Sequence, residues 1–196
     1  MPPRQDEWKP ELLAEYEQNS AIIYVLDESF RLTYCNLAWD RFAIENGGER
    51  VLRKGQIGRS VIEATPSRLR PFYIAMYGRV LQYGEEADCV YECSSAETFR
   101  RFHMHVKRRV VPNGGSFAVV INSLVLEEPH RSPDAPYNTE ALRDKNGLVT
   151  MCTHCRRTLL PQSLDTWVWA PDLVRKMPLN VSHGICPVCF DIYYGR

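Results

Sequence analysis

The sequence of 196 residues lacks any apolar run of about 20 residues, which is the length that a helix needs to cross a bilayer. It also lacks, near Met1, the apolar segment that a secretory signal peptide carries. Neither charge is in excess, because 24 basic residues balance 24 acidic ones. We therefore expect a cytoplasmic protein with no membrane contact, and the balanced charge argues against nucleic acid as a partner.

Sequence motifs that are typical of catalytic sites are also absent. The sequence has no glycine loop for phosphate, no kinase or cyclase segment and no Ser/His/Asp arrangement. We therefore predict no catalytic residue and expect a protein that is not an enzyme. The hydrophobic content of 44% is still enough for a core, and the length suits one domain with a small additional module.

Composition divides the chain into four parts. Residues 127–147 are polar and contain Pro129, Pro133 and Pro136, so they are predicted to be a linker. Before them, residues 1–19 are predicted to hold an N-terminal helix and residues 20–126 an α+β domain. Residues 148–196 form a C-terminal module that holds four of the seven cysteines.

The first half of the α+β domain shows two strands and a helix. Ala21–Leu26 is a short apolar run, which predicts a strand buried on both faces. Apolar and polar residues alternate from Phe30 to Cys35, which predicts a second strand. Asn36 is the predicted N-cap of a helix that ends at Gly47 and Gly48.

The second half shows the longest helix and three strands. Thr65 and Pro66 are predicted to open this helix as its N-cap and first residue, and Gly84 is predicted to end it. The strands that follow centre on Cys89–Cys93 and on Phe102–Val106, and the last runs from Ser116 to Leu126, after a turn at Pro112–Gly115.

This order of two strands, several helices and three antiparallel strands resembles the PAS domain family over residues 20–126. The string Leu32–Trp39 is similar to the family's second strand entering its first helix, and Gly58–Val61 is similar to its short turn in mid-domain. The resemblance implies a five-stranded antiparallel sheet with helices on one face. Another small α+β fold is the alternative.

PAS domains often hold a small ligand between helices and sheet, so the resemblance also implies a ligand pocket. The candidate lining residues are apolar or aromatic and lie on the two longer helices: Trp39, Phe42, Phe72, Met76 and Tyr77. Aromatic residues at helical spacing also serve as plain core, which is the alternative here. The sequence names no ligand for this pocket.

The C-terminal module contains two Cys-x-x-Cys pairs, Cys152 with Cys155 and Cys186 with Cys189. A gap of two residues lets both sulfurs of a tight turn face one ion, and two such turns supply four thiolates at tetrahedral geometry. The spacing therefore predicts a structural Zn²⁺ site on these four cysteines, with no open position for a reacting water.

Three alternatives to zinc remain open. The cysteines could be unliganded, or they could be redox-active dithiols, although neither pair lies in the βαβ unit of a thioredoxin-like motif. The ion could also be iron, because Cys186–Cys189 resembles a rubredoxin turn. Rubredoxin turns place glycine after the second cysteine, whereas Arg156 and Phe190 stand there.

His154 and His183 lie close to the cysteines. Either could replace a cysteine as ligand; His154 is expected to point outward, and His183 to hydrogen-bond a thiolate or a carbonyl oxygen. An exposed ring with no role at the metal is the alternative for both.

The string Val181–Cys189 is similar to a Ser-His-Gly-Ile-Cys-Pro-x-Cys element that follows PAS domains in many bacterial signalling proteins. Met151–Arg157 matches the upstream half of that element, and the aromatic Trp167–Trp169 lies between the two halves. The resemblance covers residues 148–194 and implies a bacterial sensor-type protein.

Two further features suggest interactions. His103 and His105 alternate with apolar residues, so they share one strand face, either as a metal or partner site or simply as exposed polar residues. The strand residues Phe117–Ile121 are apolar on both faces. The second face needs a cover, for which the N-terminal helix, the zinc module or a second subunit of a homodimer are the candidates.

These observations lead to a PAS sensor or interaction module joined to a structural zinc module, which acts on a partner signalling protein or through rearrangement of a homodimer. A thiol-based redox switch, in which oxidation of the cysteines releases the metal, is the alternative. Nucleic-acid binding through Arg156, Arg157, Arg175 and Lys176 is a third hypothesis, which the zero net charge disfavours.

Overall fold

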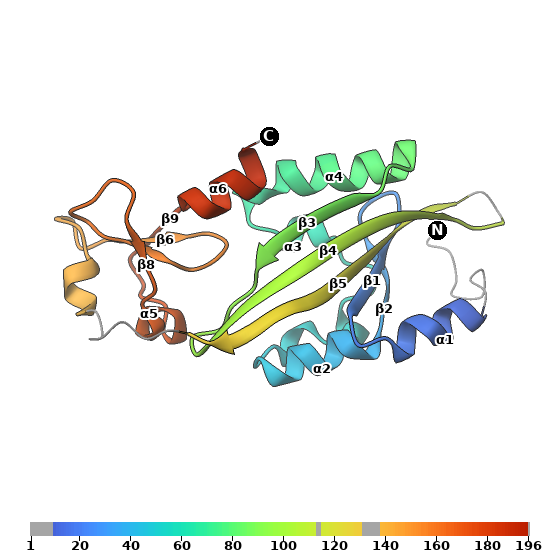
Figure 1. Ribbon diagram of the computed structural model, residues 1–196, viewed down its shortest axis with the longest axis horizontal. Coiled ribbons are helices and arrows are strands. Elements are labelled where there is room, and N and C mark those ends of the chain that lie inside the picture. Colours follow the sequence, from blue (N-terminus) through green and yellow to red (C-terminus); the bar gives the residue numbers. More distant parts are fainter. Residues whose placement is uncertain (1–9, 113–114, 131–137, 196) are drawn as a thin grey trace. The chain divides into compact units, whose positions relative to one another are not determined.

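The computed structural model describes residues 10–112, 115–130 and 138–195 (Figure 1). By their contacts the residues divide into two compact units. The first unit comprises the chain up to Cys89 together with His103–Leu124, and the second comprises Val90–Phe102 together with the chain from Val125 onward. The predicted turn at Pro112–Gly115 falls partly outside the described residues.

A five-stranded antiparallel sheet is the main element, in the strand order β2-β1-β5-β4-β3. β1 pairs with β2 on one side and with β5 on the other, and Val25 lies opposite both Tyr34 and Val119. The α+β fold class and its five-stranded sheet, as predicted, are confirmed. The strands are β1 (Ile22–Leu26), β2 (Leu32–Cys35), β3 (Ala87–Glu92), β4 (Thr98–Val110) and β5 (Ser116–Pro129).

The helices around this sheet begin and end near the predicted signals. The Asn36 side chain accepts a hydrogen bond from the Trp39 backbone N–H at 3.2 Å, so Asn36 is the N-cap of α2 as predicted. Gly84 ends α4 in the left-handed conformation with φ of 74°. The helices are α1 (Pro10–Gln18), α2 (Leu37–Glu45), α3 (Val61–Ala64) and α4 (Arg70–Tyr83), with 3-10 turns η2 (Glu49–Val51), η3 (Arg53–Gly55) and η4 (Ser67–Leu69).

The predicted start of the longest helix is wrong. Thr65 closes α3 instead of opening α4, because its hydroxyl donates to the Val61 carbonyl at 2.7 Å. Pro66 has an extended ψ of 136° and precedes the 3-10 turn η4, and α4 begins only at Arg70. A threonine followed by proline is thus compatible with the end of one helix as well as with the start of another.

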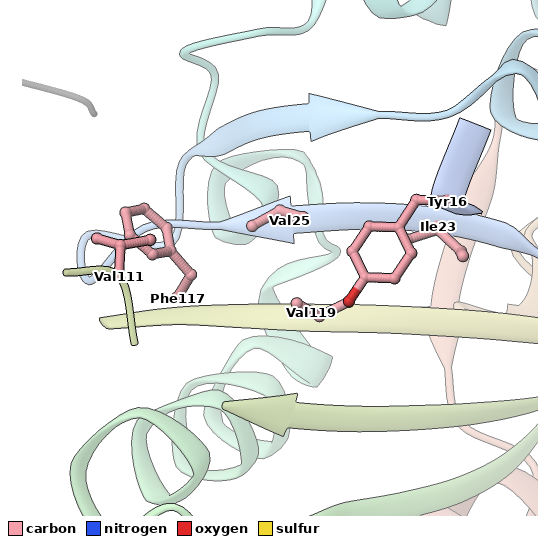
Figure 2. Close-up of a cluster of buried hydrophobic side chains, with 6 residues drawn as sticks. All are labelled: Tyr16, Ile23, Val25, Val111, Phe117 and Val119. Carbon is pink, nitrogen blue, oxygen red and sulfur yellow. The ribbon is translucent and has the colours of Figure 1, made fainter. Parts of the chain in front are cut away.

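Different helices cover the two faces of the sheet. Ile23 and Val25 belong to a buried cluster with Val119, and the ring of Tyr16 from α1 lies against it (Figure 2). Tyr24 points to the opposite face, where its ring contacts Trp39 of α2. The N-terminal helix, which was one of three predicted candidates, therefore packs against one apolar face of the sheet.

Asn36 also fastens α1 to the sheet. Its Nδ2 donates to the carbonyl oxygens of Tyr16 and Ala21 at 3.0 and 2.9 Å, and its Oδ1 accepts from the Ile23 N–H at 3.0 Å. The Asn36 side chain is fully buried, so these bonds satisfy its own amide groups, which water cannot reach. One polar side chain thus joins α1, β1 and α2.

The second unit contains a small sheet in the order β8-β7-β6-β9, in which β6 pairs with β9 in parallel and with β7 antiparallel. Its apolar core consists of Leu142, Val149, Met151, Ala170 and Leu173. The elements are η5 (Thr139–Leu142), β6 (Val149–Cys152), β7 (Thr158–Leu159), β8 (Trp167–Val168), α5 (Pro171–Arg175), β9 (Val181–Gly184) and α6 (Pro187–Tyr194).

The stretch predicted to be a linker has structure at both ends. β5 continues to Pro129, and Leu142 in η5 is 1% exposed within the core of the second unit. Residues 131–137 lie outside the described part of the chain, and the predicted domain boundaries stay a prediction. Among the helices that the structure describes, none combines the length and the apolar character that crossing a bilayer would require.

Candidate metal centre

Four cysteine sulfurs converge in the second unit. Cys152 ends β6, Cys155 lies in the turn that follows, and Cys186 and Cys189 flank the first turn of α6. All four residues are buried, and their Sγ atoms lie within 4.8 Å of one another. A tetrahedron of sulfurs around one zinc ion has edges of about 3.8 Å, given a metal–sulfur distance of about 2.3 Å. The cluster therefore fits a single tetrahedral ion.

The first Cys-x-x-Cys turn is closed by an arginine in a conformation that glycine usually adopts. The Arg156 N–H donates to the Cys152 carbonyl at 3.2 Å, and Arg156 has a φ of 69°. The tight turn thus forms without glycine. The absence of glycine after Cys155 is therefore no evidence against iron at this turn.

The second pair lies at the start of a helix. Cys186 is the N-cap of α6, Pro187 occupies its first turn, and the Phe190 N–H donates to the Cys186 carbonyl at 2.8 Å. The Cys186 N–H also points at the Cys152 sulfur, 3.5 Å away. A helix N-terminus and backbone N–H groups both stabilise negative charge on sulfur, so this position favours thiolates.

The four thiols change one another's acidity. Hydrogen bonds from Cys155, Cys186 and Cys189 hold the pKa of Cys152 far below its usual range, whereas the neighbouring sulfurs, Cys152 first, raise the pKa of Cys155 and Cys189. The pKa of Cys186 is lowered to about 7, so two of the four sulfurs ionise readily and the other two do not. A divalent cation at the centre would allow all four to ionise, because it compensates their mutual repulsion.

Neither predicted neighbouring histidine joins the cluster of ligand atoms. The His154 ring packs edge-on against Tyr193, with centroids 5.0 Å apart, and the Tyr193 hydroxyl lies 3.2 Å from its ring nitrogens. Burial lowers the pKa of His154. His183 lies exposed on β9. Sequence reasoning missed Tyr193, which is held near the ring by α6.

The hairpin between β3 and β4 packs against the metal-binding region within the second unit. Arg157, two residues after Cys155, donates to Glu92 of β3 at 2.9 Å. Burial lowers the pKa of Arg157, but the hydrogen bond to Glu92 and the nearby Cys155 outweigh burial and raise it. The Trp169 indole N–H donates to the Ala96 carbonyl at 3.2 Å. No local sequence signal pairs these residues, because 65 and 73 positions separate them.

Two of the four basic residues considered for nucleic-acid binding take part in ion pairs. Arg157 is paired with Glu92, and Arg175 with Glu97 at 2.7 Å and with Asp172 at 2.8 Å. Arg156 and Lys176 are exposed. Carboxylates therefore neutralise two of these four positive charges.

The residues predicted to line a ligand pocket lie on α2 and α4. Tyr77 is buried, and its hydroxyl lies 3.0 Å from that of Tyr24, whose ring meets Trp39 edge-on. Burial raises the pKa of Tyr24 to about 12. Sequence reasoning missed Tyr24, because it stands in an apolar strand. Phe42, Phe72 and Met76 are half-buried, and Phe72 contacts the ring of Tyr73.

A hollow of about 560 Å³ in the first unit lies elsewhere, between α1, β2 and η3. Arg53 donates to Glu17 at 2.6 Å and to Asp40 at 2.8 Å, and Tyr34 donates to the other oxygen of Glu17 at 2.6 Å. The lining residues are Leu13, Ala14, Glu17, Tyr34, Cys35, Arg53, Lys54 and Ile57. Glu17, Tyr34 and Arg53 therefore already satisfy one another's polar groups.

No family model and no curated protein matches the chain. Among solved structures, the PAS domain of Bordetella pertussis BvgS is 16% identical over 60% of this chain and 87% of its own, with a TM-score of 0.48. The PAS domain of nitrogen regulation protein NR(II) from Vibrio parahaemolyticus is 14% identical over 60% of this chain and all of its own, with a TM-score of 0.39.

Vibrio cholera VqmA, in a complex with ligand and DNA, is 11% identical over 60% of this chain with a TM-score of 0.46. The match spans 52% of the VqmA chain. All three TM-scores lie below 0.5, so function is inferred below from the residues of the chain itself.

Proposed function

We propose that this chain is a bacterial signal-sensing regulatory protein of the PAS type, active in the cytoplasm, with a structural Zn²⁺ on Cys152, Cys155, Cys186 and Cys189. The observation that carries the proposal is the convergence of four buried sulfurs within 4.8 Å. The five-stranded sheet and the similarity of Val181–Cys189 to an element of bacterial signalling proteins support the sensor role.

Zinc is the ion that this donor set suits best. Four thiolates at tetrahedral geometry match its ligand preference, and they leave no position for a reacting water, so the ion stabilises the fold. We expect about one zinc per chain and no visible absorption band in the purified protein. A visible band would indicate iron, haem or flavin and would overturn this proposal.

The sensing site is proposed to lie between the helices and the sheet, around Trp39, Phe42, Phe72, Met76 and Tyr77. The Tyr24–Tyr77 hydroxyl pair supports this, because it offers a polar group inside an aromatic cluster. Native mass spectrometry tests for a resident ligand. A mass equal to the chain plus its metal alone would contradict one.

The chain is proposed to transmit its signal by binding a partner signalling protein or by rearrangement of a homodimer. The contacts of Arg157 and Trp169 support a coupled output, because they tie the hairpin of the large sheet to the metal-binding region. Exposed apolar side chains such as Leu124 on β5 support an interface. Light scattering across a concentration series tests the homodimer, and a monomer at every concentration would contradict it.

A thiol-based redox switch is a second candidate. The sulfurs of Cys155 and Cys186 lie 3.5 Å apart, and Cys186 stands at a helix start that favours its thiolate. Hydrogen peroxide would convert one thiolate to a sulfenic acid and release hydroxide. A second thiol would then displace water from the sulfenic acid and form a disulfide. Only two of the four cysteines would remain as ligands, which is not enough to retain zinc.

Zinc release during mild peroxide treatment tests the switch. A chromogenic chelator added with the oxidant reports free zinc, and a thiol reductant given afterwards should restore binding. Retention of zinc at physiological peroxide levels would reject the switch and leave the structural role intact.

A further inference from the structure

A group of histidine and carboxylate side chains, which are residue types that bind metals, lies on the first unit where β3 and β4 pair. His103 and His105 alternate with the buried Phe102 and Met104, so both imidazoles leave the same face of β4. The Oδ1 atom of Asp88 on β3 lies 2.8 Å from His103 Nε2 and 3.1 Å from His105 Nδ1. Two imidazoles from one strand thus meet a carboxylate from its neighbour.

A second carboxylate lies behind one of these rings. Glu86 Oε2 is 3.6 Å from His105 Nε2, the nitrogen that faces away from Asp88. A histidine that binds a metal through one nitrogen commonly gives its other N–H to a carboxylate, which orients the ring and raises its basicity. Ion pairing with Asp88 alone does not account for a carboxylate on each side of the His105 ring.

The donor types and their exposure suit an exchangeable ion. Imidazole and carboxylate ligands bind Zn²⁺, Ni²⁺ and Cu²⁺, and neutral imidazole is the form that binds. The side chains of His103, His105 and Asp88 are 42%, 27% and 54% exposed, so a hydrated ion can reach them. Three protein ligands leave coordination positions for water, unlike four buried thiolates.

We propose that Asp88, His103 and His105 bind one divalent transition-metal ion, and that Glu86 orients His105. The ion replaces the protons that the two rings share with Asp88. Unlike the cysteine sulfurs, these three donors are not all within 4.8 Å of one another, so the exposed side chains must rotate to bind one ion. The proposal does not depend on which ion the cysteines hold, because all four of these residues belong to the first unit.

Calorimetric titration of the purified full chain with Ni²⁺ tests the site, after the four cysteines have been loaded with one equivalent of zinc per chain and free zinc has been removed. We expect one Ni²⁺ per chain, with no sulfur-to-nickel absorption, since its donors are nitrogen and oxygen. Affinity should fall at least about 10-fold in His103→Ala, His105→Ala and Asp88→Asn, and roughly 10-fold in Glu86→Gln.

His183→Ala is the matched control, because it removes another exposed histidine, which lies on β9 in the second unit. It should leave nickel affinity unchanged, and circular dichroism should show that all five variants fold like the parent chain. Equal affinity in His103→Ala and His183→Ala, a sulfur-to-nickel band, or no binding at millimolar Ni²⁺ would each overturn the proposal.

Discussion

In the first unit, the fully buried side chains are Asn36 and aliphatic residues from sheet and helix, among them Ile23, Val25, Val80 and Val119. In the second unit, five residues form the apolar core, and the four cysteines are buried beside it. Burial of an aliphatic side chain stabilises a fold by about 1.5–3 kcal/mol, so the first unit distributes its stability over many residues. The second unit depends on a few sulfurs and the ion that they would hold.

This difference sets how each unit responds to a single change. Removing one contact from a distributed core costs a few kcal/mol and leaves the rest in place. Removing the ion from a small module removes most of its folding free energy at once.

Metal removal is expected to have the largest effect. Apparent binding free energies of structural zinc are about 10–16 kcal/mol near pH 7, so a strong chelator should unfold residues 148–196. The hairpin Val90–Phe102 should also lose protection, because it belongs to the same compact unit. Hydrogen exchange resolved by peptide measures both.

The first unit should keep its protection during chelation, and zinc added back should restore the second unit. Loss of protection in Ile22–Leu26 on chelation would contradict the independence of the two units.

Asn36→Ala should have the next largest effect, on the first unit. The substitution leaves the buried carbonyls of Tyr16 and Ala21 and the N–H of Ile23 without their partner, which should destabilise by about 3 kcal/mol. Urea unfolding monitored by hydrogen exchange of peptides that contain Ile22–Leu26 measures the change in the first unit.

Asn46→Ala is the control for this substitution. The Asn46 side chain is exposed and donates only to the Phe42 carbonyl, so its loss should cost about 0.5 kcal/mol or less. Metal content should remain unchanged in both variants, and a loss of metal in Asn36→Ala would argue that the first unit supports the centre.

Glu92→Gln should weaken the second unit by about 2 kcal/mol, because it leaves the charge of Arg157 without its partner. The Glu92 side chain is 11% exposed, so water replaces the carboxylate poorly. Chelator competition should show faster metal loss in this variant.

Glu85→Gln provides the comparison, since its ion pair with Arg79 is 51% and 67% exposed and should contribute about 0–1 kcal/mol. Equal stability and equal metal retention in both variants would show that the hairpin contact does not support the centre.

Acid should reveal a small contribution from Glu17. Burial raises its pKa, but hydrogen bonds from Tyr34 and Arg53 outweigh burial and hold the pKa below its ordinary value. The carboxylate therefore stabilises the folded chain fully above the unfolded pKa of about 4.3, and this contribution is lost as pH falls through the folded pKa.

Glu17→Gln should abolish that part of the pH dependence, which acid unfolding of both chains would measure. The same slope below about pH 4 in the parent and the variant would show that Glu17 makes no such contribution.

Local patterns predicted the elements that local forces decide. Asn36 caps a helix, and Phe102, Met104 and Val106 face the core, because capping and alternation depend on neighbouring residues. Thr65 misled the prediction, since a hydroxyl can bond backward to a carbonyl of the preceding turn as well as cap the next helix. Arg156 shows that surrounding structure can hold a non-glycine residue at positive φ, so the missing glycine does not decide between zinc and iron at this turn.

The spacing of the four cysteines in the sequence alone predicted that their sulfurs lie together, because a gap of two residues is enough for a turn to present both sulfurs to one ion. Alternation alone determined that His103 and His105 share a face. Only the tertiary structure placed Asp88 and Glu86 around those rings, Glu92 beside Arg157 and Tyr24 against Tyr77. These contacts join strands and helices far apart in the chain, where packing decides the neighbours and no local periodicity records them.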